Sequence, residues 1–364
     1  MNASTPSMKT SEQEVKSKRS IRVAMATIVV AAFSVVVALA ALAALAATGQ
    51  QRKTEPTLLD GYRRPTTTPT PEGNPMTSGK VALGKLLFFD PRLSGSGSIS
   101  CSTCHSPSLG WQDGLPKGVG HHGAVLARRT PTILNVAWGE PFFWDGRADT
   151  LEDQAKGPLM ANMEMAGSSE KLLSFIRNSP AYRERFAQVF ANEPLSIENV
   201  AKALASYERT IVSAEAPFDR WVRGDEQALS SSAKRGFVLF NTRAKCSSCH
   251  VGWRFTDDGF HDIGLPGNDM GRAKVAPGLI IFERAFKTPT LRNIAERAPY
   301  MHDGSLSTLA QVVDHYSSGF IQRPSLSDQI TPLNLSERDK ADLIVFMKSL
   351  SSQDLPVAMP ILPN

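Results

Sequence analysis

The sequence is poor in cysteine: its 364 residues include four cysteines and five tyrosines. Glycine (26 residues), proline (24 residues), the hydrophobic share of 41% and the charged share of 21% are ordinary, which excludes a collagen-like, coiled-coil or wholly disordered chain. The net charge is +5 without a dense block of lysine and arginine, so nucleic acid is not an expected partner. At roughly 150 residues per domain, the length predicts two domains and an additional segment.

The four cysteines form two Cys-x-x-Cys-His motifs, the pattern of covalent c-type haem attachment. In this pattern two thiols form thioethers with the haem, and the adjacent histidine binds the iron. The sequence therefore predicts two covalently bound haem c groups. Haem one is expected at Cys101, Cys104 and His105, and haem two at Cys246, Cys249 and His250.

Three other uses of the cysteine pairs are less consistent with the sequence. A redox-active pair needs no following histidine, and the alternating strands and helices of a thioredoxin-like fold are not evident. A zinc site would require both pairs in one small module, but they lie far apart in the chain. If all four cysteines hold haem, no thiol remains for a disulfide.

An internal repeat accompanies the two motifs. Residues 130–137 (TPTILNVA) recur as residues 288–295 (TPTLRNIA), at an offset of 158 residues. The same offset relates residues 145–146 to 303–304 and residues 150–151 to 308–309, and Gly84–Phe88 resembles Gly236–Phe240. These matches predict a duplicated haem domain.

The periodicity of apolar residues predicts a mainly α fold with short amphipathic helices. The expected helices lie near residues 80–89, 170–190, 196–214 and 230–240. A last helix is expected to start at Ser336, with Asp339 three residues on, and to bury Leu343, Phe346 and Leu350. The predicted domains are 76–228 and 229–352, followed by a C-terminal tail, 353–364.

The N-terminal region has the features of an exported protein. Residues 1–22 are polar and basic, and residues 23–47 carry no charge. This run is long enough for a transmembrane anchor with a cytoplasmic N-terminus, although a long cleaved signal peptide is the alternative. Residues 48–75 are rich in proline and threonine and predict an extended linker. Either alternative places the remaining chain outside the cytoplasm.

Several motifs in combination resemble the bacterial di-haem cytochrome c peroxidase and MauG superfamily. They are LGKLLFFDPRLS, CSTCH, RRTPTILN, FFWDGRADTLEDQAKGPL, MEM, CSSCH, TPTLRN and APYMHDGSLSTL, and the match covers residues 76–352. The resemblance implies a peroxidatic haem one and an electron-transfer haem two. It also implies a location on the periplasmic side of the inner membrane.

The resemblance assigns roles to four residues of the N-terminal domain. Trp144 matches a tryptophan that relays electrons between the haems, and Gln154 and Glu164 match residues on the distal side of haem one. His121, in a glycine-rich loop, matches a removable sixth ligand of haem one, and His122 is an alternative. Considered without the family, Trp144 would be a core aromatic, Glu164 a surface residue and His121 an exposed loop histidine.

The repeat also distinguishes the two irons. The offset of 158 relates Pro158 to Tyr316, and only tyrosine can bind iron. In the family, ordinary peroxidases have methionine at the position of Tyr316, whereas MauG has tyrosine. A phenolate ligand would give haem two a low reduction potential. His315 and Met301 remain alternative ligands.

The family also binds a calcium ion between the haems, through an asparagine side chain and two carbonyl groups. Arg129 stands at the asparagine position here, and the carbonyl groups would belong to Arg297 and Pro299. Since a guanidinium cannot coordinate calcium, either the site is lost and Arg129 supplies the charge, or water and carbonyl groups bind the ion.

Three functions follow from these predictions. The first is a peroxidase that reduces hydrogen peroxide with electrons from a small cytochrome c or cupredoxin. The second is a MauG-like oxidase that oxidises residues of a partner protein. The third is a di-haem electron carrier without chemistry of its own. A homodimer is compatible with each of them.

Overall fold

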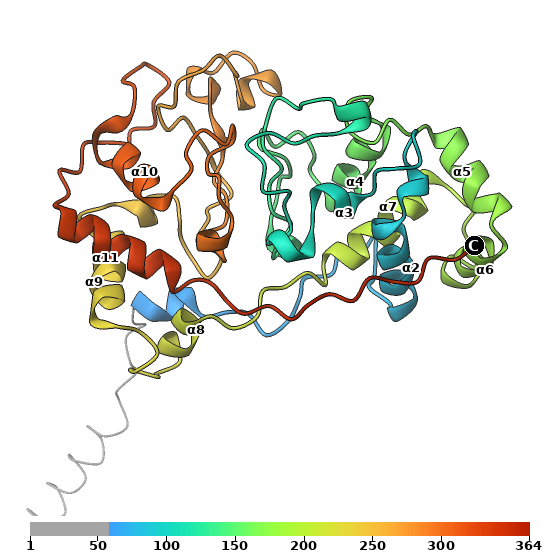
Figure 1. The fold of residues 1–364 in the computed structure, drawn as a ribbon, viewed down its shortest axis with the longest axis horizontal. Helices are drawn as coiled ribbons and strands as arrows, with labels where there is room; N and C mark the ends of the chain where they lie inside the picture. The colour runs from blue at the N-terminus through green and yellow to red at the C-terminus, as the bar shows by residue number, and fades with distance from the viewer. Residues whose placement is uncertain (1–57) are drawn as a thin grey trace, which may run out of the picture. The chain divides into compact units, whose positions relative to one another are not determined.

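The protein contains two similar sets of helices, one around each Cys-x-x-Cys-His motif (Figure 1). The computed structural model describes residues 58–364. The predicted segments 1–22 and 23–47 lie outside the described residues. Within residues 58–364, no helix combines the length and the apolar character that crossing a membrane requires.

The described residues are mainly helical, as predicted. The N-terminal half contains α2 (Ser78–Phe89), α3 (Cys101–Cys104), α4 (Leu151–Met160), α5 (Ser169–Asn178), α6 (Pro180–Val189) and α7 (Ile197–Glu208). The C-terminal half contains α8 (Pro217–Val222), α9 (Ser231–Asn241), α10 (Leu309–Asp314), a π-helical turn (His315–Gly319) and α11 (Glu337–Lys348). Its two short strands, β1 (Phe260–His261) and β2 (Phe286–Lys287), pair antiparallel. Short 3-10 helices span Leu58–Tyr62, Pro91–Leu93, Pro107–Leu109, His121–Gly123, Val136–Trp138, Cys246–Ser248, Arg272–Lys274, Ile280–Phe282 and Ile294–Glu296.

Side-chain caps define where several of these helices begin. Thr77 accepts a hydrogen bond from the backbone N–H of Lys80, and Ser230 accepts one from Ala233. At α11, Ser336 accepts from the N–H of Asp339, and the Asp339 carboxylate accepts from the N–H of Ser336. This reciprocal pair is a capping box. It confirms the predicted start of the last helix, and Leu343, Phe346 and Leu350 are buried as expected.

One close helix crossing lies at the centre of each half. In the N-terminal half α2 packs on α7, and in the C-terminal half α9 packs on α11. A Cβ atom at Gly84 would lie 1.9 Å from the carbonyl oxygen of Ala203, and one at Gly236 would lie 2.1 Å from that of Asp342. Only glycine permits such a short approach of two backbones. The two glycines matched in the sequence therefore have the same structural role.

The two halves meet across a pseudo-twofold axis. The backbone N–H of Arg129 donates to the carbonyl oxygen of His302, and the N–H of Lys287 donates to that of Trp144, both at 2.8 Å. The repeat offset of 158 relates Arg129 to Lys287 and Trp144 to His302, so the two hydrogen bonds are equivalent. Arg128 adds salt bridges to Asp145 and, across the interface, to Asp269.

The described part of the predicted linker, residues 58–75, differs from an extended chain. Tyr62 is buried in the core of the C-terminal half, and its hydroxyl donates to Asn241 at 2.7 Å. Asn74 is buried against the N-terminal half, where its amide donates to the Glu152 carboxylate at 2.7 Å. Burial of one aromatic ring and one amide ties this segment to both halves.

The C-terminal tail, residues 353–364, and helix α8 both make contacts that were not predicted from the sequence. The tail runs from the C-terminal half to the N-terminal half, where Val357 and Leu362 pack on the core (Figure 1). Arg92 donates to the carbonyl oxygen of Pro363 at 2.7 Å. Helix α8 lies before the predicted boundary at residue 228, but its Phe218 is in the C-terminal core.

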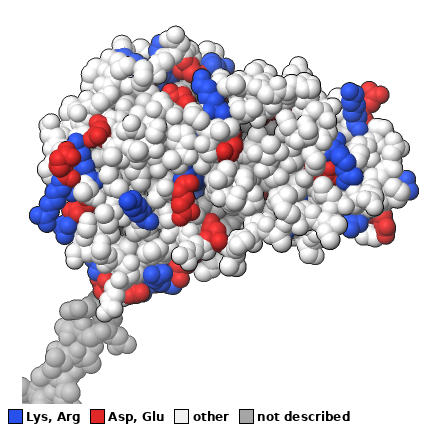
Figure 2. Space-filling view, viewed as in Figure 1, with Lys and Arg blue, Asp and Glu red and all other residues white. Residues whose placement is uncertain are grey.

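Charges of both signs are interspersed on the face of the molecule that Figure 2 shows. Ion pairs between exposed side chains include Arg63 with Asp60 and Arg220 with Asp225. Exposed pairs of this kind contribute little stability, typically ~0–1 kcal/mol each. The stability of each half therefore depends mainly on its core and its helix crossing.

We expect Gly236→Ala to destabilise the C-terminal half. Alanine usually stabilises a helix interior relative to glycine by ~1 kcal/mol. Here the added Cβ would overlap a backbone carbonyl, and overpacking of this kind costs ~1–3 kcal/mol. Urea unfolding of the haem-loaded protein measures the difference. Gly73→Ala is the control, because no atom lies within 4 Å of its Cβ position. A stabilised Gly236→Ala protein would contradict the close crossing.

Candidate active site between the two halves

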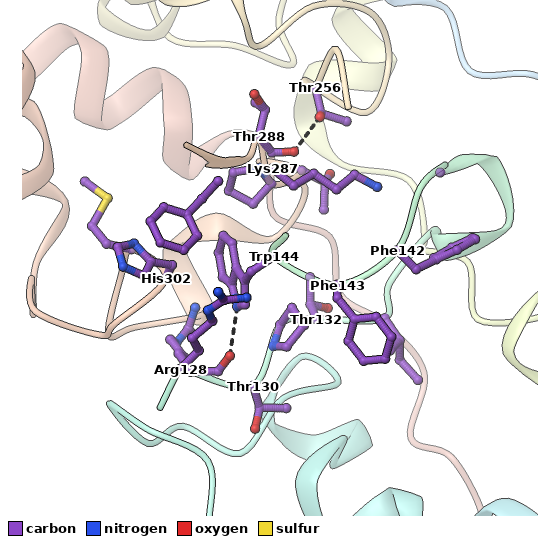
Figure 3. A pocket seen from close by; sticks show the side chains of 18 of the residues that line it. Arg128, Thr130, Thr132, Phe142, Phe143, Trp144, Thr256, Lys287, Thr288 and His302 are labelled. Carbon is purple, nitrogen blue, oxygen red and sulfur yellow. Dashed lines mark hydrogen bonds between the residues drawn. The ribbon is translucent and has the colours of Figure 1, made fainter. Parts of the chain in front are cut away.

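A cavity of about 790 Å³ is lined by both Cys-x-x-Cys-His motifs and by residues of both halves (Figure 3). The first motif contributes Cys101, Cys104 and His105, and the second contributes Cys246, Cys249 and His250. All four cysteines are free of disulfide bonds. The cavity therefore brings together the two predicted attachment sites.

Both motif histidines are oriented as iron ligands. The Nδ1 atom of His105 lies 3.1 Å from the carbonyl oxygen of Trp111, and that of His250 lies 2.8 Å from that of Phe255. A proton on Nδ1 leaves Nε2 free to bind a metal. Burial lowers the pKa of both imidazoles, which favours the neutral form that a metal requires. This donor set fits two covalently attached haem groups.

Trp144 lies at the interface of the halves and lines the cavity (Figure 3). Its indole Nε1 donates to the carbonyl oxygen of Arg129 at 2.9 Å, and its own carbonyl oxygen accepts from Lys287. Its ring centroid is 6.4 Å from that of His302. The side chain is thus held by groups of both halves, in a position consistent with the predicted relay.

His302 was not predicted as a site residue, although the repeat relates it to Trp144. Its ring stacks on Phe286 with a centroid distance of 3.5 Å, and it lines the cavity. Burial lowers its pKa to about 4, so the imidazole is neutral at pH 7. The offset of 158 would have found this residue, because the contact joins the two equivalent positions of the repeat.

The predicted distal residues of haem one also line the cavity. Gln154 and Pro158 come from α4, and Glu164 follows this helix. Burial raises the pKa of Glu164, and the Arg147 guanidinium opposes this shift. Arg147 lines the same cavity and lies over the ring of Phe143 at 3.5 Å. A carboxyl group that can hold a proton therefore lies in the cavity beside a cation.

His121 is placed differently from the other predicted residues. Gly120 lines the cavity, but His121 is not among its lining residues. The backbone N–H of His121 donates to the carbonyl oxygen of Glu164 at 2.8 Å, and its Nδ1 is buried without a hydrogen-bond partner among the described residues. His122 is exposed. The loop is thus attached to the chain beside Glu164, and a ligand role for His121 stays a prediction.

Tyr316 lies in the π-helical turn and lines the cavity, as does Met301. The neighbouring His315 has a different environment, because its Nε2 lies 2.8 Å from the carbonyl oxygen of Ile263. Burial raises the pKa of Tyr316. Among the three alternative ligands, the geometry favours Tyr316 or Met301 over His315.

Arg129 occupies the space where the family resemblance placed a calcium site. Its guanidinium donates to the carbonyl oxygen of Arg297 at 2.6 Å and to the side chain of Gln112. Burial lowers the pKa of Arg129 to about 10 and that of Arg297 to about 9. The Arg297 carbonyl group, one of the two expected to bind calcium, therefore already accepts a hydrogen bond from a cationic guanidinium.

We expect chelation of calcium to leave the wild-type protein unchanged. The Arg129 guanidinium already donates a hydrogen bond to the Arg297 carbonyl group, so EGTA should alter neither the haem absorption spectrum nor the thermal midpoint. Arg129→Asn supplies the family's side chain and should make the thermal midpoint rise when calcium is added. Calcium-dependent stabilisation of the wild-type protein would contradict this expectation.

Comparisons with known proteins agree with this site. The family model for di-haem cytochrome c peroxidase matches residues 78–227, and the cytochrome c model matches residues 233–351. Methylamine utilization protein MauG of Methylorubrum extorquens is 52% identical over 305 residues, which cover 83% of this chain and 86% of the relative. Cytochrome-c peroxidase IdrP1 of Pseudomonas sp. strain SCT is 38% identical, with 81% and 87% covered.

A solved structure described as a MauG-like protein associated with microbial copper homeostasis has the same fold. Its TM-score is 0.73 at 31% identity, covering 83% of this chain and 96% of that one. Two haem-attachment motifs on a duplicated helical fold define a di-haem c-type cytochrome. The chain belongs to the di-haem cytochrome c peroxidase and MauG family. The predicted family, the two covalent haem c groups and the peroxidase-type oxidoreductase activity are thereby confirmed.

Proposed function

We propose that this protein is a MauG-like oxidase that uses hydrogen peroxide to oxidise aromatic residues of a partner protein. The observation that carries the proposal is Tyr316, which lines the cavity while His315 is hydrogen-bonded elsewhere. Two MauG proteins, 52% and 48% identical to this chain, support it. One peroxide takes two electrons and two protons to become two waters, and the electrons come from the partner protein.

Bound haem c supplies iron that can hold the oxidising equivalents of peroxide. With haem one in place, Glu164 would accept a proton from hydrogen peroxide and return it to the departing oxygen, which is general acid–base catalysis. Burial raises the pKa of this carboxyl group, which helps it to hold the transferred proton. Gln154 of α4 also lines the cavity, and its side-chain amide would orient the peroxide.

Trp144 provides the path between the two halves. Its indole is fixed by the Arg129 carbonyl group in one half, and its backbone accepts from Lys287 in the other. A rigid aromatic group between two redox centres shortens each electron-transfer step. Electrons taken from the partner protein at the C-terminal half therefore reach the N-terminal half through Trp144.

In this proposal Tyr316 is the iron ligand that makes haem two chemically different from haem one. Its hydroxyl has no hydrogen-bond partner among the described residues, and burial raises its pKa. A cation would compensate for the cost of ionising the buried phenol. As a ligand of haem two, the Tyr316 oxygen would favour the oxidised iron and would occupy a coordination position that an exogenous ligand needs.

A peroxidase is the second candidate. The cytochrome-c peroxidase of Pseudomonas sp. strain SCT, 38% identical, supports it, and so does the pair of Gln154 and Glu164. In this alternative a small cytochrome c or cupredoxin donates electrons at haem two. A simple electron carrier is not proposed, because the chain is a peroxidase-type oxidoreductase. In either case we propose a periplasmic location, with residues 23–47 as anchor or signal.

Stopped-flow spectroscopy of the diferric protein with stoichiometric hydrogen peroxide tests the proposal. We expect a long-lived species two oxidising equivalents above the diferric protein, formed without prior reduction. Tyr316→Met should raise the haem-two potential, because a thioether favours reduced iron more than a phenolate does. If the wild type reacts only after one haem is reduced and then turns over rapidly with reduced cytochrome c, the protein is a peroxidase. An unchanged potential in Tyr316→Met would show that Tyr316 is not the ligand.

Glu164→Gln should slow peroxide cleavage while leaving the haem spectra intact. Loss of a general acid–base group typically costs ~10²–10⁴-fold in rate. Single-turnover stopped-flow measurements with the diferric protein give the rate directly. Glu170→Gln, an exposed residue on α5, is the matched control. Equal rates in Glu164→Gln and the wild type would remove Glu164 from the mechanism.

A further inference from the structure

Another carboxyl group, Glu208, lies in the cavity that holds the attachment motif of haem one. Glu208 is the last residue of α7, is 6% exposed and lines the cavity near the first motif. Its Oε2 atom has no hydrogen-bond partner among the described residues. The charge of Glu208 contributes to raising the pKa of Cys101, so the carboxyl group is near a cysteine that attaches haem one. An unpaired buried carboxyl group is costly and calls for a functional explanation.

The structural repeat shows that the fold does not require a carboxyl group at this position. At the two helix crossings, Gly84 faces Ala203 and Tyr207, and Gly236 faces Asp342 and Phe346. An offset of 139 relates Ala203 to Asp342 and Tyr207 to Phe346. The same offset relates Glu208 to Met347. Met347 is also buried and also lines the cavity. The same scaffold therefore accepts an apolar side chain beside haem two.

The charged neighbours of Glu208 do not neutralise it. The adjacent Arg209 directs both guanidinium nitrogens to Glu152 of α4, at 2.7 and 2.9 Å. Burial raises the pKa of Glu208 to about 8, while Arg209 lowers this pKa and Glu152 raises it. The neighbouring Tyr207 is itself buried and neutral, since burial raises its pKa to about 12. A small change of nearby charge can therefore add or remove the Glu208 proton near neutral pH.

We propose that Glu208 is the proton-linked group of haem one. When haem one gains one electron from its donor, the Glu208 carboxylate takes one proton from solvent. When that electron leaves, the proton leaves as well. Net charge in the low-dielectric cavity is thereby conserved in both directions. This inference requires only that haem one is attached at Cys101, so it holds for the oxidase and for the peroxidase.

Spectroelectrochemical titration of the haem-loaded protein between pH 6 and pH 10 tests the inference. Both midpoint potentials are recorded at each pH. In the wild type we expect one of them to fall with rising pH, because the carboxylate formed at high pH favours ferric iron. The slope should approach one proton per electron. Glu208→Gln should remove this slope and leave the other potential unchanged.

Two further variants make the test specific. Glu198→Gln, an exposed residue on the same helix, should retain the wild-type slope. Glu164→Gln removes the other cavity carboxyl group whose pKa burial raises, and it should also retain the slope. If Glu208→Gln retains the slope, or if Glu164→Gln abolishes it, the inference is wrong.

A third variant and a measurement on the wild type allow for a Glu208→Gln protein that does not fold. Glu208→Met introduces the residue of the other half and should also give a pH-independent potential. Infrared difference spectra of the wild type at pH 8 should show the signal of a protonated carboxyl group appearing on reduction. Absence of that signal, or a pH-dependent potential in Glu208→Met, would overturn the inference.

Discussion

The reciprocal pair of backbone hydrogen bonds across the pseudo-twofold axis is the constraint on which the site depends. Arg129 donates to His302 and Lys287 donates to Trp144, so the two halves are joined by the same contact made twice. A residue at such an axis lies in an equivalent position with respect to both halves. Trp144 and His302 are therefore adjacent because of the symmetry, and an indole at this point has access to both haem sites.

Differences between the two halves arise from a few residues on this common scaffold. The helix crossings at Gly84 and Gly236 are the same, and both motif histidines bond to a backbone carbonyl group. The cavity residues differ: Pro158 corresponds to Tyr316, Trp144 to His302 and Glu208 to Met347. Proline cannot bind iron, whereas tyrosine can, so the proposed difference between the two haem sites follows from this pair. Such residues can change the chemistry of each iron without a change in the fold.

Features that depend on local sequence could be predicted, whereas those that depend on long-range contacts could not. The attachment motifs, the repeat and the capping box at Ser336 are local patterns, and the structure contains each of them. The burial of Tyr62 and the course of the tail depend on partners more than 150 residues away. The hydrogen bond between His315 and Ile263, which distinguishes His315 from the other two alternative ligands of haem two, also joins residues far apart in the chain, 52 residues from each other.

Similarity alone does not decide between the two candidate activities, because relatives of both names share this fold. The Arg129 guanidinium at the Arg297 carbonyl group and the indole at the interface fit either activity. The discriminating feature in our proposal is the ligand of haem two, for which Tyr316 and Met301 both line the cavity. A phenolate oxygen stabilises the oxidised iron, so it suits a centre that stores oxidising equivalents and opposes one that must first be reduced. A thioether has the opposite preference, and the phenol of Tyr316 is therefore the strongest argument for an oxidase.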